Sequence, residues 1–268
     1  MEDHQPPDNS LETQKPVPGF TGGSWWRIRT PLADLRDAPD GHRQRQLLLG
    51  ARVRLTGDVL DGHGPVSAEH DGYTGYVALD CLGADSEVSH QVASRATHLY
   101  PEADFKAEEL AALSFGAQLL VLDERPKFYE TSAGFVPKKH LRPLDRPFTD
   151  PVTLAQMFFG TPYLWGANSS AGIDCSGLIQ AALRGCGIAC PGDSGAQQAA
   201  LGTDLAPGTP WQRGDLLFWS GHVALVVDVD TLIHANAHHM AVAYEPIARA
   251  IARIEAQGEG PVTAHKRL

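Results

Sequence analysis

The sequence predicts an α+β protein in which two small β domains precede a C-terminal domain of helices and an antiparallel sheet. Two stretches before residue 145 share one pattern of short alternating strands. Prolines at positions 143, 147 and 151 then mark a linker, after which helical periodicity alternates with apolar strands. Alternating apolar and polar residues indicate strands, whereas apolar residues at i, i+1, i+4 and i+5 indicate one face of a helix.

The composition is that of an ordinary globular chain with an excess of negative charge. Its 268 residues are 43% hydrophobic and carry a formal net charge of -10, and the sequence pI is about 5.6. Binding to a nucleic-acid backbone or to an anionic membrane surface needs a positively charged face. The chain also lacks the run of ~20 apolar residues that a membrane helix needs. We therefore expect neither a nucleic-acid partner nor a membrane partner.

The N-terminal segment and the cysteines bear on the compartment. Residues 1–20 are acidic, contain four prolines and lack the basic start and apolar stretch of a secretory signal. We therefore expect a disordered tail and a cytoplasmic protein. In that compartment Cys81, Cys175, Cys186 and Cys190 are expected to remain free thiols. Cys186 and Cys190 have no second cysteine pair of the kind that a metal site uses, and core packing explains them.

The two β domains, expected over residues 21–84 and 85–145, are two copies of one unit. Each copy has an alternating strand, a short aromatic strand and an apolar residue five positions later. Short strands separated by Gly, Asp and Pro favour compact barrels over helical repeats. The matching segments are residues 50–55, 75–77 and Leu82 in the first copy and 116–121, 134–136 and Leu141 in the second, and residues 25–28 and 94–100 open the copies.

The C-terminal domain, expected over residues 150–268, combines helices with an antiparallel sheet. A helix near residues 153–159 is followed by a second over residues 175–186, in which Leu178, Ile179, Ala182 and Leu183 form one apolar face. A last helix is expected to begin with proline, a residue that the first position of a helix favours. The expected strands are residues 215–219, 222–229 and 232–235, and the last helix is residues 246–254.

Cys175 is the candidate nucleophile. Asp174 is a residue type that caps helices, so Cys175 is expected in the first turn of its helix. There the helix dipole favours a negative charge and lowers the pKa of a thiol. The backbone N–H of Cys175 is also a natural donor to an oxyanion at such a position. A buried cysteine that follows a capping residue by chance would look the same, so this pattern needs a base to support it.

His222 and His234 are the candidate base and its orienting partner. If the turn between their strands centres on Val229, the two histidines share one face of the sheet as diagonal neighbours. A two-residue turn at positions 229 and 230 would place them on opposite faces. On one face, one imidazole can deprotonate Cys175 while the other holds its tautomer.

A metal site is the competing interpretation of these residues. His222, His234, His238, His239, Cys175 and Asp215 offer potential ligands. However, the chain lacks both a His-Glu-x-x-His helix and a Cys-x-x-Cys pair. We therefore expect no metal and no other cofactor.

Taken together, these runs resemble the NlpC-type cysteine peptidases, a papain-like family of cell-wall hydrolases. The resemblance implies that Cys175 is the nucleophile, His222 the general base and His234 the orienting residue. It also implies that the β domains are SH3-like barrels. The runs occur in the family's order: Gly160-Thr161-Pro162-Tyr163-Leu164-Trp165-Gly166, Asp174-Cys175-Ser176-Gly177-Leu178, Gly214-Asp215-Leu216-Leu217-Phe218-Trp219, Gly221-His222-Val223 and Ile233-His234-Ala235.

The layout resembles the subgroup that cleaves γ-D-glutamyl–diamino acid bonds in peptidoglycan peptides with a free N-terminal L-Ala. The family's Pro-Arg-Asp-Ser run is Pro191-Gly192-Asp193-Ser194 here, so its arginine is missing. By this resemblance Asp174 or Asp193 pairs with the peptide's ammonium group. The other residues expected to bind substrate are Tyr163, Ser176 and Ser194, with Tyr73 and Tyr76 from the first SH3-like domain and an acidic contact from Asp37, Asp40 or Glu69.

The resemblance thus implies a cytoplasmic endopeptidase that acts on peptidoglycan-derived peptides during murein recycling. It leaves open whether the diamino acid is lysine or diaminopimelate, and it gives no oligomeric state. An amidase or acyltransferase of the same fold, or a non-catalytic module that binds wall peptides, are the alternatives. The set of Cys175, His222 and His234 argues against the non-catalytic module.

Overall fold

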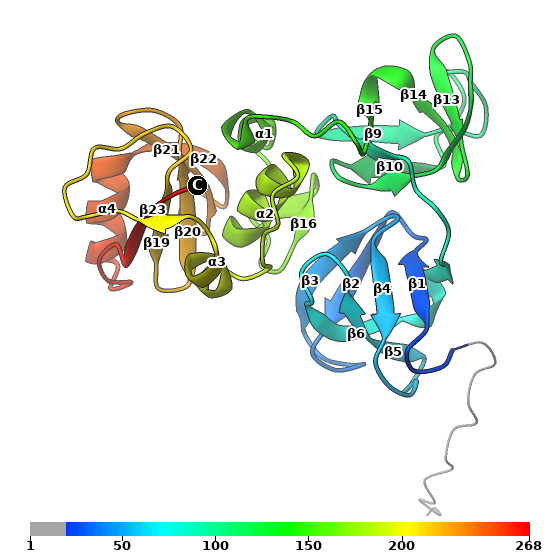
Figure 1. Cartoon of the computed structure of the whole chain (residues 1–268), viewed down its shortest axis with the longest axis horizontal. Helices are drawn as coiled ribbons and strands as arrows, with labels where there is room; N and C mark the ends of the chain where they lie inside the picture. The colour runs from blue at the N-terminus through cyan, green and yellow to red at the C-terminus, as the bar shows by residue number, and fades with distance from the viewer. Residues whose placement is uncertain (1–19) are drawn as a thin grey trace, which may run out of the picture.

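The computed structural model describes residues 20–268 and consists of three bodies (Figure 1). Two small β domains, domain 1 and domain 2, lie on one side of a larger C-terminal domain. None of the helices in the described part of the chain is long and apolar enough to cross a membrane. The expected tail falls on residues 1–19, outside the described residues. Phe20, which was assigned to that tail, instead stacks on Trp26 with ring centroids 4.3 Å apart and packs with domain 1.

Domain 1 is a single curved sheet closed around an apolar core. Ile28, Leu35, Val53 and Val77 fill this core, each from a different strand. The strands lie in the order β3-β2-β6-β5-β4-β1-β7. Their bounds are Trp25–Ile28 (β1), Leu32–Arg36 (β2), Arg43–Leu48 (β3), Arg52–Leu55 (β4), His63–Ala68 (β5), Thr74–Ala78 (β6) and Leu82–Ala84 (β7).

Domain 2 repeats the design of domain 1 in a looser form. Its strands form three small sheets, and the 3-10 turn Lys138–His140 precedes its last strand, as Leu79–Cys81 does in domain 1. The domain opens with a strand at His90, earlier than the expected start at residue 94. The bounds are His90–Val92 (β8), Ala96–Leu99 (β9), Ala111–Ser114 (β10), Gln118–Leu119 (β11), Val121–Glu124 (β12), Phe128–Thr131 (β13), Gly134–Pro137 (β14) and Leu141–Pro143 (β15).

The C-terminal domain is an antiparallel sheet with helices on both faces. Its strands lie in the order β18-β23-β19-β20-β21-β22. The helices are Pro151–Met157 (α1), Cys175–Gly185 (α2), Ser194–Ala200 (α3) and Ile247–Ala256 (α4). The strands are Asn168–Ser169 (β16), Gly172–Ile173 (β17), Thr203–Asp204 (β18), Leu216–Trp219 (β19), His222–Val226 (β20), Thr231–Asn236 (β21), Ala241–Pro246 (β22) and Ala264–Arg267 (β23).

Alternation along the sheet assigns its two faces. Phe218, Val223 and Ile233 pack against α1 and α2. Leu217, Ala224 and Leu232, one position away, pack against α4 on the other face. Because side chains alternate along a strand, His222 and His234 belong to the α4 face.

Three expectations about this domain need correction. The first helix begins at Pro151 rather than near residue 153, with Asp150 as its cap. Pro246 is the N-cap of α4 and not its first residue. The strand expected over residues 222–229 ends at Val226, where the chain turns toward β21. The short helix α3 and the strands β22 and β23 were not predicted, because none has a long periodic pattern of its own.

The three bodies interlock through a few residues. Phe115 of domain 2 belongs to the apolar core that lies under α1 and α2. Leu49 of domain 1 belongs to the core of domain 2, and its carbonyl accepts a hydrogen bond of 2.8 Å from the backbone N–H of Gln118. Domain 1 therefore holds a defined position over the start of α2.

Candidate active site

Asp174 places Cys175 at the first position of α2. Its side chain accepts a hydrogen bond of 2.6 Å from the backbone N–H of Gly177, as the capping pattern predicts. Gly177 is required here, since a Cβ at this position would lie 2.7 Å from the carbonyl oxygen of Ala167. The Cys175 side chain is buried, and its Sγ lies 3.9 Å from the carbonyl oxygen of Gly221.

The pKa of the Cys175 thiol differs from the expectation. Burial, together with the Asp174 carboxylate, raises this pKa to about 12. The backbone N–H groups of Ser176 and Val223 act in the opposite direction but do not outweigh burial. The helix start was expected to lower the pKa, but in a site this dry the desolvation of the thiolate dominates. The resting Cys175 side chain is therefore a neutral thiol, which would need a base in order to act as a nucleophile.

His222 and His234 lie on one sheet face and contact each other. The pairs Leu225 with Ile233 and Val226 with Leu232 centre the turn on Val229, which is the same-face alternative. The Nε2 atom of His222 lies 2.9 Å from the Nδ1 atom of His234. Burial and the neighbouring imidazole lower the pKa of His222 to about 3. The imidazole that faces the thiol's cavity is therefore neutral and able to accept a proton.

Glu245 continues this chain of contacts and was missed by the sequence argument. One of its carboxylate oxygens lies 3.2 Å from Nε2 of His234, and Arg253 of α4 donates to both oxygens at 3.0 and 2.8 Å. Burial alone would raise the pKa of Glu245, but the hydrogen bonds from His234 and Arg253 hold it below its ordinary value. The sequence offered no clear signal for Glu245, because β22, the strand that carries it, was not predicted.

This chain of contacts assigns the tautomers. An ionised carboxylate only accepts hydrogen bonds, so His234 donates to Glu245 from Nε2. Its Nδ1 atom then accepts from the Nε2–H of His222. The remaining nitrogen of His222, Nδ1, keeps its lone pair and is the basic atom of the site.

The thiol lies where two cavities meet. The first cavity, of about 290 Å³, lies between the C-terminal domain and domain 1. The second, of about 400 Å³, is lined by residues that include His222, Asn236 and Glu259. Cys175, Tyr163 and Gly221 line both. A chain-like substrate can therefore extend through both cavities with its scissile bond at Cys175.

Most residues expected to bind substrate line the first cavity, together with the unpredicted Gln44 and Trp165. Tyr76 does not, and it lines a neighbouring hollow instead. None of the three acidic candidates lines the cavity: Asp37 accepts a hydrogen bond from Gln44, and Glu69 pairs with Arg52. The predicted residues that line it are Tyr73, Tyr163, Asp174, Ser176, Asp193 and Ser194.

Asp174 and Asp193 differ in availability. The Asp174 oxygens also accept hydrogen bonds from Ser176 Oγ at 3.1 Å and from the N–H of Gly166 at 2.9 Å. Asp193 is exposed, and its carboxylate has one side-chain partner among the described residues, the Tyr73 hydroxyl at 3.4 Å. Asp193 is therefore the carboxylate that is free to meet a cationic group.

Arg45 of domain 1 was also missed by the sequence argument. Its buried guanidinium donates to Ser176 Oγ at 3.1 Å and to Gln180 Oε1 at 3.2 Å. A Cβ on Gly192 would lie 2.7 Å from the ring of Tyr73 and 3.3 Å from the Nε atom of Arg45. Domain 1 thus fills the space beside position 192 with its own guanidinium, and Gly192 leaves room for it.

Three side chains at this site could together serve as metal ligands. His234, His239 and Glu245 place one ligand atom each within 4.8 Å of one another. However, His234 and Glu245 are bonded to each other, and Arg253 already donates to the carboxylate. An ion would have to break these bonds. Asp215, named among the potential ligands, instead pairs with His265 and Arg267.

Comparison with known proteins agrees with this geometry. Residues 160–254 match the NlpC/P60 family, and residues 35–82 match the bacterial dipeptidyl-peptidase SH3 domain. The chain is 26% identical over 238 residues to a γ-D-glutamyl-L-lysine dipeptidyl-peptidase of Bacillus cereus, covering 76% of this chain and 70% of the relative. A Bacillus subtilis protein of the same name is 26% identical over 217 residues, covering 72% of each chain.

A crystal structure of an NlpC/P60 family protein from Bacillus cereus shares the fold. It superposes with a TM-score of 0.77 over 91% of this chain and 99% of its own, at 22% identity. Residues 160–254 therefore form a domain of the NlpC/P60 type behind a bacterial SH3 domain, and the protein is a hydrolase.

Proposed function

We propose that this hydrolase cleaves the γ-D-glutamyl–diamino acid bond of peptidoglycan peptides that have a free N-terminal L-Ala. The observation that carries the proposal is the first cavity, in which Asp193 and Tyr73 lie near the thiol and domain 1 forms one wall. A carboxylate there favours an ammonium group. The names of the two Bacillus relatives support the same bond.

In the proposed reaction the thiol proton moves to Nδ1 of His222 as Cys175 Sγ attacks the γ-carbonyl carbon. The backbone N–H of Cys175 donates to the developing oxyanion, because the first turn of a helix has N–H groups without intrahelical partners. The protonated His222 then gives its proton to the leaving amine of the diamino acid. Water, deprotonated by His222, hydrolyses the thioester and restores the thiol.

His234 and Glu245 act through His222. The imidazolium that forms on His222 donates through Nε2 to His234, and the anionic Glu245 stabilises the positive charge from the far side. This arrangement does for a thiol enzyme what a buried Asp does behind the histidine of a serine enzyme. The negative charge of Glu245 therefore makes protonation of His222 easier during the reaction, although the resting pKa of His222 is low.

The requirement for a free amine tests the proposal. The comparison is L-Ala-γ-D-Glu-diaminopimelate against the same peptide N-acetylated or still attached to muramic acid, with the products identified by mass spectrometry. A blocked peptide loses its pair with Asp193, and its acetyl or muramyl group must also fit against the wall that domain 1 forms. Together these effects should make the blocked peptides at least ~100-fold poorer substrates. Equal rates for free and blocked peptides would make the enzyme a general wall hydrolase and remove the recycling role.

The proposed role is murein recycling in the cytoplasm, where released peptides have free N-termini. Cell fractionation with an antibody to the full chain tests the location, and a fully extracytoplasmic signal would contradict it. Defined muropeptides with lysine or diaminopimelate at the third position also test the alternative chemistry. Cleavage of another amide, or acyl transfer without hydrolysis, would indicate an amidase or acyltransferase.

A further inference from the structure

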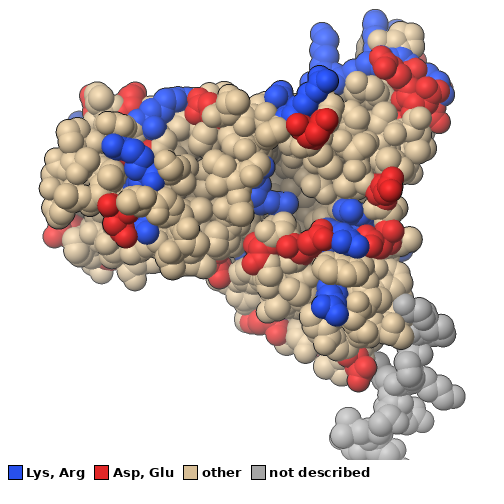
Figure 2. Space-filling model, viewed as in Figure 1, with Lys and Arg blue, Asp and Glu red and all other residues tan. Residues whose placement is uncertain are grey.

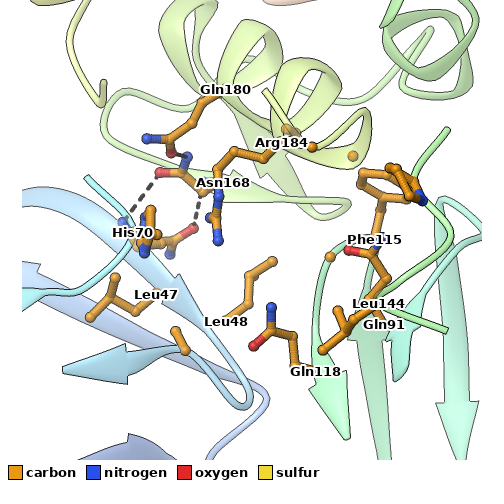
Figure 3. Close-up of a pocket in the computed structure, with 17 residues that line it drawn as sticks. Leu47, Leu48, His70, Gln91, Phe115, Gln118, Leu144, Asn168, Gln180 and Arg184 are labelled. Carbon is orange, nitrogen blue, oxygen red and sulfur yellow. Dashed lines mark hydrogen bonds between the residues drawn. The ribbon is translucent and has the colours of Figure 1, made fainter. Parts of the chain in front are cut away.

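A third cavity lies away from the thiol, where domain 1, domain 2 and the C-terminal domain meet. This cavity of about 160 Å³ is lined by residues of domain 1, domain 2 and α2. Figure 2 shows the junction as a hollow in which Lys or Arg atoms are visible. In Figure 3 Arg184 extends from α2 and Gln118 from β11 toward the same space. The cavity has room for several waters or for one small organic molecule.

Arg184 has no partner at contact distance. Among residues 20–268, none accepts a hydrogen bond from its guanidinium or forms an ion pair with it. Burial lowers the pKa of Arg184, and the attraction of the Asp71 carboxylate offsets this effect only in part. The Arg184 side chain is partly exposed, and charges that are largely removed from water are normally paired. This guanidinium therefore lacks a counter-charge that a ligand can supply.

Asp71, the acidic residue that acts most strongly on Arg184, provides only part of that counter-charge. The Asp71 carboxylate attracts Arg184 from beyond ion-pair distance. One of its oxygens is bonded to His70 at 3.3 Å and to the Gln180 amide at 2.8 Å. Its other oxygen accepts from the backbone N–H of Tyr73 at 3.0 Å. Burial alone would raise the pKa of Asp71, but these contacts lower it to about 2. Asp71 is ionised and already engaged.

Two amides in the wall are also unengaged. The side chains of Gln91 and Gln118, both from domain 2, line the cavity and make no hydrogen bond with another described residue. Gln91 is 9% exposed. The amide of Gln46, in contrast, is bonded to Asn168 and Asp34. The unengaged donors are thus one guanidinium and two amides.

His70, Asn168 and Gln180 also line the cavity, but each already has a polar side-chain partner. One part of the wall is apolar. Leu47, Leu48, Phe115 and Leu144 line it, and Figure 3 shows Leu48 next to the space that Arg184 enters. A guanidinium binds a carboxylate through two parallel hydrogen bonds. We propose that this junction binds a small monocarboxylate, with the carboxylate on Arg184 and its short alkyl group against the leucines. Such a ligand would join α2 to both β domains.

The test uses the full chain and the sodium salts of acetate, propionate, butyrate and hexanoate at constant ionic strength. Binding is followed by thermal shift and by the side-chain NH2 signals of Gln91 and Gln118 in 15N-HSQC spectra. Each methylene should tighten Kd about fourfold until the alkyl group fills the cavity. Inorganic phosphate serves as the comparison, because it offers the charge without an apolar part.

The variants separate the cavity from the general surface. Arg184→Met should weaken butyrate binding at least tenfold, and Arg249→Met, which removes an exposed arginine of α4, should not. Gln118→Leu keeps the guanidinium and should weaken binding less than Arg184→Met does. This second variant shows whether a loss of binding in Arg184→Met comes from the site or from misfolding. Equal thermal shifts in the parent and Arg184→Met would overturn the site. Tighter binding of phosphate than of butyrate would overturn the assignment to a monocarboxylate.

Discussion

The Nη1 atom of Arg45 in domain 1 lies 3.1 Å from the Oγ atom of Ser176, the residue that follows the nucleophile. The same atom is 3.6 Å from the Asp174 carboxylate that caps the nucleophile's helix. Arg45, which is 131 positions before Ser176 in the sequence, thus contacts both sequence neighbours of Cys175. Domain 1 therefore helps to build the catalytic end of α2, besides forming a wall of the cavity.

Replacement of Arg45 by Met should reduce kcat more than it raises KM. The guanidinium holds Ser176 and Asp174 around the thiol, and loss of this positioning should cost roughly 10- to 100-fold in kcat, equivalent to about 1.4–2.7 kcal/mol. Steady-state kinetics on the tripeptide measure the split. Arg54→Met, an exposed arginine of the same domain, is the control. Partial recovery in Arg45→Lys is expected, and a pure KM effect would assign Arg45 to substrate binding.

Replacement of Gly192 by Ala should act through Tyr73. The new Cβ would lie 2.7 Å from the Tyr73 ring, so the ring must shift, which disturbs the contact of its hydroxyl with Asp193. We expect KM for the free tripeptide to rise severalfold, with less effect on kcat. In a Tyr73→Ala background the same change should have little further effect, because residues in contact do not act additively. Independent, additive losses in the double variant would contradict this explanation.

Among His222, His234 and Glu245, replacement of His222 should cause the largest loss of kcat/KM. Loss of a general base typically costs ~10²–10⁴-fold in rate. His234→Gln and Glu245→Gln keep polar groups in place and should cost less. Comparison of kcat/KM across His222→Ala, His234→Gln and Glu245→Gln gives the order, with the exposed Glu255→Gln as the control. A larger loss in His234→Gln than in His222→Ala would exchange their roles.

The reactivity of the thiol should follow its raised pKa. Because burial raises the pKa of Cys175 to about 12, the rate of alkylation by iodoacetamide should keep rising through pH 9 in the free enzyme. The Cys175→Ser variant reports the background from the other three cysteines, and it should also be inactive because a serine hydroxyl ionises far less readily. A plateau below pH 7 would show that the resting site is a thiolate–imidazolium pair.

His222 should make the stability of the protein depend on pH. The unfolded imidazole titrates near 6.5 and the folded one near 3, so below pH 6.5 the unfolded state binds the extra proton. The contribution of His222 is therefore complete above pH 6.5 and is lost as the pH falls toward 3. From pH 7 to pH 5 the parent should lose roughly 1–2 kcal/mol more than His222→Gln. Urea unfolding at both pH values measures this, and parallel losses would contradict the lowered pKa.

Local patterns were enough to predict the nucleophile's position and the order of the elements around it. Asp174 caps α2 through a contact three residues away, and such short-range hydrogen bonds are determined by residue type and spacing. The alternation of β20 and β21 likewise restricted His222 and His234 to two arrangements. The pairing of Leu225 with Ile233 selected one of them, and the sequence alone did not.

The remaining features depend on contacts between distant segments. Glu245 reaches His234 only because β22 pairs with β21, and Arg45 reaches Ser176 only because domain 1 packs over α2. The pKa of Cys175 is raised, whereas the capping motif predicted a lowered value. The reason is the same, because the thiol is buried by the folded domain and not by the capping motif. Residue types and spacing thus determined that Cys175 begins a helix and that His222 and His234 lie in neighbouring strands. Tertiary packing decided their ionisation and supporting contacts, because desolvation and contacts across domains depend on segments that no local pattern brings together.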